Sequence, residues 1–240
     1  MDAYGYCYQN PINLVDPDGR SAESIIINNN TGEATYVNDG IDKVFVTNQT
    51  GYDVVSKYKS SIESGNTANA SSLLATIQSG GYELNLNSDI GKIARTTFAE
   101  MSGLGTSNVD RQVVAESIVN RHSDGKSYED ILVPRTYNAI NREEYKDPFG
   151  SIDKIRTEAK YFYKANEASI TGNLANSFSA AFKAVKGIGS KIESMPMSYV
   201  SAPRTSTYFD GTRYDATRMN VNITSKIQGL KGIVGVWTAK

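Results

Sequence analysis

The sequence predicts a mixed α+β protein with a helical centre. Three features support this fold class: β-like alternation between residues 21 and 50, apolar residues at helical spacing between 88 and 186, and short apolar runs separated by Pro, Gly, Asn and Asp after residue 197. At 240 residues, of which 39% are hydrophobic, the chain can bury one sizeable core. We expect a mainly helical lobe, a β-containing C-terminal part and a small N-terminal β appendage.

The first elements along the chain are strands. Apolar runs at residues 25–27 and 34–37 flank a turn sequence, and a third run at 44–46 follows after another turn. This pattern predicts a hairpin or a three-stranded meander. Residues 59–87 are rich in Ser, Asn, Gly and Ala around a short apolar patch, which predicts a connector with one modest helix.

Two helices are expected in the middle of the chain. Ser88 can cap the first helix, and Gly103 and Gly105 can end it. Ser107 precedes Asp110 by three residues, which is close to a capping box and predicts the start of the second helix. Apolar residues lie almost all round this second helix, so we expect it to be central and buried.

Two further helices are expected at residues 151–166 and 173–186, where apolar side chains recur at helical spacing. The second of these is rich in lysine and ends at a glycine, which favours an ordinary surface helix. From residue 197 onward, the short apolar runs between turn residues predict strands.

Glu100 is the residue that most clearly suggests chemistry. On a helix that includes Ile93 and Thr97, it lies at the edge of the apolar stripe, in the last turn before the glycines. A carboxyl group beside an apolar wall has a raised pKa, and a general acid needs such a rise. The alternative is a solvated glutamate that pairs with Arg95 or a nearby lysine.

A family resemblance favours the first interpretation. Residues 93–103 (IARTTFAEMSG) and 114–121 (VAESIVNR) resemble the cell wall hydrolase family that includes spore cortex-lytic enzymes. The similarity continues through 128–141 (YEDILVPRTYNAIN) and the Asp-Pro pair at 147–148. The resemblance implies a lysozyme-like helical lobe in which the glutamate after Phe98 and Ala99, which is Glu100, is catalytic.

The same resemblance implies the substrate contacts. It places Tyr137 against a sugar face and assigns hydrogen bonds with acetamido or hydroxyl groups to Asn138 and Asn141. Ser102 and Tyr208 are further candidates for substrate binding.

The chain departs from the family pattern at two places. Leu104, Gly105 and Thr106 stand where a second acidic residue is common, and Glu116 stands at a position that is usually small and apolar. Glu116 is therefore either a second carboxylate of the site or a residue of the helix surface.

The reaction that the resemblance implies is cleavage of the peptidoglycan strand between N-acetylmuramic acid and N-acetylglucosamine. Hydrolysing glycosidases use two carboxyl groups, whereas one glutamate suffices for a lytic transglycosylase. With Glu100 as general acid and base, we expect a lytic transglycosylase. Two alternatives remain: a hydrolytic muramidase in which Glu116 or Asp110 assists a water, and a non-catalytic effector toxin that acts by protein contact.

A second resemblance concerns the start of the chain. Residues 4–20 (YGYCYQNPINLVDPDGR) resemble the closing segment of an Rhs (YD-repeat) core, which encapsulates a C-terminal toxin in such proteins. This implies three parts: the end of an Rhs-like core at 1–20, a β-hairpin region and connector at 21–87, and a cell wall hydrolase-like catalytic domain at 88–240.

The Rhs resemblance also implies a role in interbacterial competition. The expected protein is a toxin that a contact-dependent machine, type VI secretion, delivers to the periplasm of the target cell. The expected partners are glycan strands, a cognate immunity protein and the Rhs core shell.

Composition excludes several other classes. A balance of 25 Lys and Arg against 26 Asp and Glu gives a net charge of −1, which provides no general attraction to nucleic acid. The single histidine, His122, has no His or Cys at ligand spacing, so we expect no metal and no cofactor. The single cysteine, Cys7, rules out an internal disulfide. The sequence has no signal-peptide pattern and no apolar run approaching 18 residues, so we expect no membrane span.

Overall fold

A computed structural model of the chain describes residues 23–101, 106–123, 125–152, 167–191, 197–201, 221–223 and 233–239. Within these ranges the protein is mixed α+β, which confirms the predicted fold class at that level. The Rhs-like segment at 1–20, two of the candidate site residues (Ser102 and Tyr208) and most of the helix expected at 151–166 lie outside the described residues.

The chain divides into two compact units. The first comprises Met1–Ser88 and Asp147–Ala175, and the second comprises Asp89–Lys146 and Asn176–Lys240. The division after Ser88 falls next to the expected start of the catalytic domain at residue 88. The assignment of 147–175 to the first unit follows from contacts between distant parts of the sequence, which the local pattern does not contain.

The first unit contains a four-stranded sheet. Its strands are β1 (Ser24–Asn28), β2 (Ala34–Val37), β3 (Val44–Thr47) and β4 (Gly81–Glu83), and their order across the sheet is β2-β1-β3-β4. The expected hairpin is confirmed, since β1 and β2 pair antiparallel with Ile26 opposite Thr35.

The expected three-stranded meander is wrong. Strand β3 pairs with β1 in parallel, and not with β2, and β4 then pairs antiparallel with β3. All residues of β1 and β3 are buried, whereas most of β2 is only half-buried, so the apolar strands occupy the centre and β2 takes an edge. The connection to β3 is held to the start of β1, because Ser24 Oγ donates to the Ile41 carbonyl oxygen at 2.9 Å.

Three helices follow β3: α1 (Gln49–Asp53), α2 (Val55–Glu63) and α3 (Thr67–Ser79). Helix α3 is the one modest helix expected within residues 59–87, whereas α1 and α2, which runs into that segment, were not expected. Of the Asn and Gly residues in the expected connector, Gly65 and Asn66 lie at helix ends. Asn48 caps α1 by accepting from the Gly51 N–H, Asn66 caps α3 in the same way, and Gly65 adopts a φ of 71° between α2 and α3.

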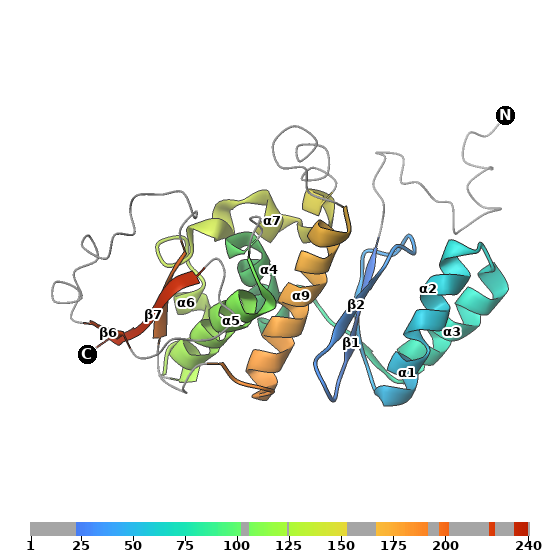
Figure 1. The fold of residues 1–240 in the computed structure, drawn as a ribbon, viewed down its shortest axis with the longest axis horizontal. Coiled ribbons are helices and arrows are strands. Elements are labelled where there is room, and N and C mark those ends of the chain that lie inside the picture. Colours follow the sequence, from blue (N-terminus) through green and yellow to red (C-terminus); the bar gives the residue numbers. More distant parts are fainter. Residues whose placement is uncertain are drawn as a thin grey trace. The chain divides into compact units, whose positions relative to one another are not determined.

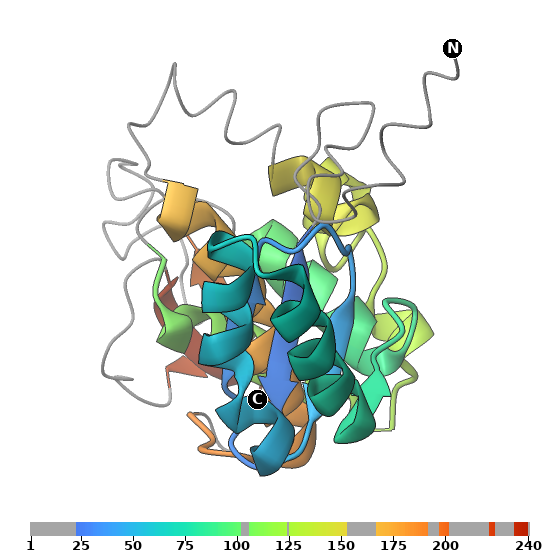
Figure 2. The same ribbon diagram turned by 90° about the vertical axis from the view of Figure 1, so that its right-hand side faces the viewer.

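Figures 1 and 2 show α1, α2 and α3 on one face of this sheet. Their apolar side chains and those of the sheet form one hydrophobic core, made of Ile26, Val37, Phe45, Val55, Tyr58, Ala70 and Ile77. A buried polar pair borders this core, because the Tyr58 hydroxyl donates to Asp39 Oδ2 at 2.7 Å. Burial raises the pKa of Asp39 to about 6, although the hydrogen bonds from Tyr58 and the Ile41 N–H act in the opposite direction.

The second unit is built on two helices that contact each other, α4 (Asp89–Glu100) and α5 (Asn108–Ser123). Three short elements follow α5: α6 (Tyr128–Ile131), the 3₁₀ turn η2 (Asn138–Asn141) and α7 (Glu143–Lys146). Every residue from Asp110 to Ile118 on α5 is buried, which confirms the prediction of a central helix.

The third long helix, α9 (Glu167–Lys186), begins six residues before the expected helix at 173–186 and contributes residues to both units. The expectation of a surface helix is wrong, because Leu174, Phe178 and Phe182 are fully buried. The lysines that suggested a surface lie only in the last turn, and small Ala and Ser residues fill the other inward positions. Residues 148–152 are helical as well, and begin before the expected start at 151.

Strands β5 (Met197–Ser201), β6 (Val221–Ile223) and β7 (Ile233–Ala239) confirm the expected β-rich C-terminal part. They form an antiparallel sheet with β7 between β5 and β6. Strand β5 also contacts α5, so the sheet belongs to the second unit.

Candidate functional site

Glu100 is the last residue of α4. The residues from Ile93 to Ala99 before it are all buried, and Glu100 itself is half-buried. Its neighbour Met101 is buried and donates its backbone N–H to the Thr97 carbonyl oxygen at 3.0 Å, which closes the last turn of the helix. The side chain of Glu100 therefore stands at the end of a well-anchored helix, at the edge of the buried core of this unit.

The groups around Glu100 come from η2 and from the residues that flank it. Burial raises the pKa of Glu100, whereas the backbone N–H of Ala139 and the guanidinium of Arg142 lower it. The described salt bridges join Lys43 with Glu83, Lys92 with Glu129, and Lys146 with Glu143, and none of them includes Glu100. Arg95, the partner that the alternative interpretation suggested, instead donates Nη1 to the Tyr145 carbonyl oxygen at 3.2 Å. A half-buried carboxyl group with a raised pKa, outside any described ion pair, can hold a proton and release it.

Tyr137 lies next to this carboxylate but is only 3% exposed. The guanidinium carbon of Arg121 lies 5.6 Å from the centre of its ring. Burial raises the pKa of the Tyr137 phenol, and the charge of Glu100 acts in the same direction. The charge of Arg121 and a hydrogen bond with the Ser117 side chain act in the opposite direction. The ring therefore offers no open face for the expected stacking on a sugar.

Asn138 and Asn141 are exposed, in contrast to Tyr137. Both belong to η2, and Asn141 Nδ2 lies 3.5 Å from Asn138 Oδ1, at the limit of a hydrogen bond. Their amides are accessible from solvent, on the same turn that carries Ala139 against Glu100.

Helix α5 begins with the predicted capping box. The backbone N–H and the hydroxyl of Ser107 donate to Asp110 Oδ2 at 2.6 and 2.7 Å, and the Asp110 N–H donates back to the Ser107 hydroxyl at 3.1 Å. Asp110 is fully buried, so its carboxylate serves the helix start and is not placed to assist a water.

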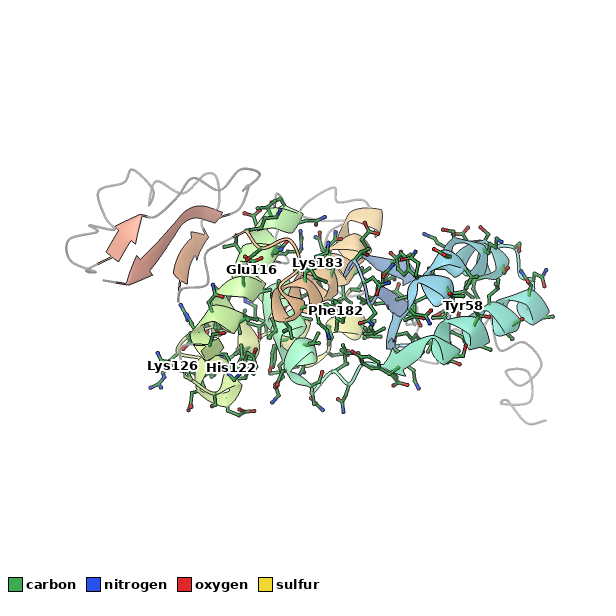
Figure 3. The ribbon with its side chains drawn as sticks, turned by 90° about the horizontal axis from the view of Figure 1, so that it is seen from below. Tyr58, Glu116, His122, Lys126, Phe182 and Lys183 are labelled. Carbon is green, nitrogen blue, oxygen red and sulfur yellow. The ribbon has the colours of Figure 1, made fainter. Side chains whose placement is uncertain are left out.

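Glu116 is neither at the helix surface nor open to a substrate. It is 4% exposed, accepts a hydrogen bond from Gln112 Nε2 at 2.8 Å, and accepts from the backbone N–H of Lys191 through both carboxylate oxygens, at 3.0 and 2.9 Å. The expectation of a helix-surface residue is therefore wrong. Glu116, labelled in Figure 3, therefore attaches the segment after α9 to the middle of α5 through Lys191.

Arg111 contributes to the site without having been singled out from the sequence. It is 1% exposed, and its Nη2 donates to the Met101 carbonyl oxygen at 3.3 Å and to Thr106 Oγ1 at 2.8 Å. Burial lowers its pKa to about 10, and the neighbouring Asp110 acts in the opposite direction. The sequence did contain a signal for it, because a helix that is apolar almost all round has no polar face on which an arginine among those positions could be exposed.

His122 lies in the last turn of α5, where the negative end of the helix dipole favours a basic residue. Its ring stacks on that of Tyr128 with 4.0 Å between centroids, and Nδ1 lies 2.8 Å from the carbonyl oxygen of Lys126 (Figure 3). Among the described residues, no three or more His, Cys, Asp and Glu side chains come together as metal ligands. No helix in the described part of the chain has the length and the hydropathy needed to cross a bilayer.

Comparison with protein-family models, with curated proteins and with solved structures finds no match to this chain. The functional interpretation therefore depends on the residues themselves and on the geometry around Glu100.

Proposed function

We propose that the second unit is a lysozyme-like lobe that cleaves peptidoglycan strands between N-acetylmuramic acid and N-acetylglucosamine, as a lytic transglycosylase with Glu100 as general acid and base. The observation that carries the proposal is the state of Glu100: a half-buried carboxyl group with a raised pKa, outside any described ion pair, at the end of α4. The choice of glycan follows from the resemblance of residues 93–148 to cell wall hydrolases.

In the proposed reaction, protonated Glu100 donates its proton to the oxygen that joins the two sugars, and the bond from C1 of N-acetylmuramic acid to that oxygen breaks. The resulting carboxylate takes a proton from the 6-hydroxyl of the same sugar. The 6-oxygen then bonds to C1 and closes a 1,6-anhydro ring. Glu100 ends the cycle protonated, and no water is consumed. A raised pKa favours the first step, because it increases the fraction of the carboxyl group that is protonated at a given pH.

Exposed side chains of η2 are the best-placed substrate contacts. We assign Asn138 and Asn141 to hydrogen bonds with the sugars, because their amides are accessible on the turn that contacts Glu100. Tyr137 is more consistent with packing beneath the site than with stacking, given its burial. Ser102 and Tyr208 stay in the proposal on the sequence resemblance alone.

The biological setting is proposed from the Rhs-like segment at residues 4–20. The chain would be the toxin of an Rhs protein, delivered by type VI secretion, acting on the glycan in the periplasm of a competitor and neutralised by a cognate immunity protein. If the setting is correct, expression should harm a bacterium only when the protein is directed to the periplasm. Harm from expression in the cytoplasm alone would argue for another target.

The test of the reaction is incubation of purified sacculi with the protein, with Glu100→Gln and with Glu116→Gln, followed by mass spectrometry of the released fragments. We expect 1,6-anhydro ends from the first and third proteins and none from Glu100→Gln. Reducing ends would instead indicate a hydrolytic muramidase. Intact glycan together with retained toxicity of Glu100→Gln would indicate an effector that acts by protein contact.

A further inference from the structure

Arg142 connects η2 and α7 to the turn of α4 that carries Glu100. Its Nη1 donates to the carbonyl oxygen of Ala99, the residue immediately before Glu100, at 3.1 Å. This bond reaches a carbonyl in the last turn of the helix, where a positive charge is favourable. The guanidinium is therefore held next to the Glu100 backbone by a bond that involves no carboxylate.

The backbone of Arg142 is fixed as well. Its N–H donates to the Ala139 carbonyl oxygen at 2.9 Å, which ends η2, and its carbonyl oxygen accepts from the N–H groups of Tyr145 and Lys146 at 3.2 and 3.3 Å, which begins α7. A second hydrogen bond joins the same elements, with the donor on α4 and the acceptor on α7. Arg95 of α4 donates to the Tyr145 carbonyl oxygen at 3.2 Å and lies over the Tyr145 ring at 4.5 Å. The two arginines together fix the position of η2 and α7 relative to α4.

The proposed reaction needs a positive group at this place. Glu100 is neutral before it donates its proton and negative until it takes the proton of the 6-hydroxyl, so a charge exists in a half-buried position for part of each cycle. Such a charge is costly unless a cation or N–H donors face it. Arg142 and the Ala139 N–H are the groups that favour the charged form of Glu100.

We propose that Arg142 is a positioning residue for Glu100, which holds the last turn of α4 in place and compensates the negative charge on the carboxylate between the two proton transfers. This inference rests on the proposed function. Other charged or titratable groups described near this turn are Tyr137, whose phenol is buried, Arg121 of α5, which lies over the Tyr137 ring, and the buried Arg111, which donates to the Met101 carbonyl oxygen. Arg142 differs from these, since it is exposed and its charge lowers the pKa of Glu100.

The experiment compares Arg142→Gln, Arg142→Lys and a matched control, Arg135→Gln, in the full chain. Arg135 is an exposed arginine in the segment before η2 and is not one of the groups that shift the pKa of Glu100. The carboxyl carbons of glutamate are labelled with ¹³C, the Glu100 signal is assigned from its absence in Glu100→Gln, and its pKa is measured by NMR titration. The kinetics of anhydro-end formation from sacculi are then measured across the pH range.

We expect Arg142→Gln to raise the pKa of Glu100 by about half a unit to one unit, since an exposed charge at this range is partly screened. Arg142→Lys should restore part of this shift, because lysine keeps the charge but lacks the planar fork of donors. Arg135→Gln should leave the pKa unchanged. In the kinetic measurements, Arg142→Gln should lower kcat several-fold with little change in KM. It should also move the basic limb of the kcat–pH profile to higher pH.

The two hypotheses fail in different ways. An unchanged pKa of Glu100 in a folded Arg142→Gln protein would overturn the role of Arg142, whatever the activity. A pKa that moves as expected, with no glycan product from any form, would overturn the proposed function and leave the coupling between Arg142 and Glu100 in place. If Arg142→Gln does not fold, the comparison of Arg142→Lys with the unaltered protein decides: a lysine variant with unchanged pKa and unchanged kcat would show that the guanidinium has no specific role.

Discussion

Replacement of Glu116 tests whether its carboxylate has a structural or a catalytic role. Glu116 is almost fully buried and accepts hydrogen bonds from Gln112 Nε2 and from the backbone N–H of Lys191. The proposed function assigns all of the acid–base chemistry to Glu100, whereas a hydrolytic muramidase would need a second carboxyl group. Glu116→Ala and Glu116→Gln should therefore lower stability and spare activity, and Glu100→Gln should do the reverse.

The loss of stability expected for Glu116→Ala can be worked out from the hydrogen bonds that Glu116 accepts. Hydrogen bonds to a charged group contribute about 1.5 to 3 kcal/mol each. After Glu116→Ala, however, Gln112 Nε2 keeps the carbonyl oxygens of Gly189 at 2.7 Å and Ile188 at 3.2 Å, and the exposed Lys191 can bind water. The expected loss is therefore near the lower limit, about 2 to 4 kcal/mol, or a melting temperature lower by roughly 5 to 15 °C. Glu116→Gln keeps one oxygen acceptor and should lose about 1 to 2 kcal/mol.

The assay is thermal and urea unfolding by circular dichroism, combined with product analysis from sacculi at a temperature where every variant is folded. Glu63→Ala, at the exposed end of α2, is the control and should change stability by less than about 0.5 kcal/mol. A Glu116→Gln protein of unchanged stability that no longer cleaves glycan would refute the reasoning, and would make Glu116 the second carboxylate of a hydrolase.

Three further outcomes follow from the structure. The folded pKa of Asp39, about 6, lies above its ordinary value of 3.8, so protonation of Asp39 favours the folded state. This contribution to stability is complete below about pH 4, and about 2 to 3 kcal/mol is lost as the pH rises through 6. Urea unfolding measured across this pH range should show the loss in the unaltered protein and not in Asp39→Asn. Gly81→Ala should lower the free energy of unfolding by about 3 kcal/mol or more, measured by thermal unfolding, because a Cβ there would overlap the Val46 carbonyl oxygen. At Gly172 in α9 a Cβ would meet no atom, so Gly172→Ala should raise the free energy of unfolding by about 0.5 to 1 kcal/mol. Asp110→Ala should cost about 1 to 2 kcal/mol, measured by the same method, through loss of the α5 capping box; an unchanged melting temperature would contradict it.

Elements whose cause is local could be predicted from the sequence. The β1–β2 hairpin depends on a turn between two apolar runs, and the start of α5 depends on Ser107 and Asp110, three residues apart. The buried state of α5 follows from apolar residues on all its sides. In each case the residues that determine the structure are neighbours in the chain, so a pattern of types and spacings contains the information.

Elements whose cause is tertiary could not be predicted. A parallel β1–β3 pair and an antiparallel meander have the same local signals, and the choice depends on which strands the whole unit buries. Helix α9 carries lysines that suggest a surface, yet its buried positions are set by what packs against it. Gly65 and Asn66, in the connector expected at 59–87, are equally typical of a linker and of helix ends, so the sequence pattern alone does not distinguish the two.

The candidate site shows the same division. The position of Glu100 at a helix end follows from a short stretch of sequence, but its proton affinity does not, because the groups that oppose burial come from Ala139 and Arg142, about forty residues later in the chain. A helix-edge glutamate with no such partners would remain protonated too firmly to act as a base in the second step, and one paired closely with an arginine would not hold the proton for the first. In the proposed mechanism, Arg142 avoids both extremes, because it donates to the carbonyl of Ala99 and leaves the carboxylate of Glu100 without a described salt bridge. The distinction between a solvated glutamate and a general acid therefore depends on this contact between distant segments.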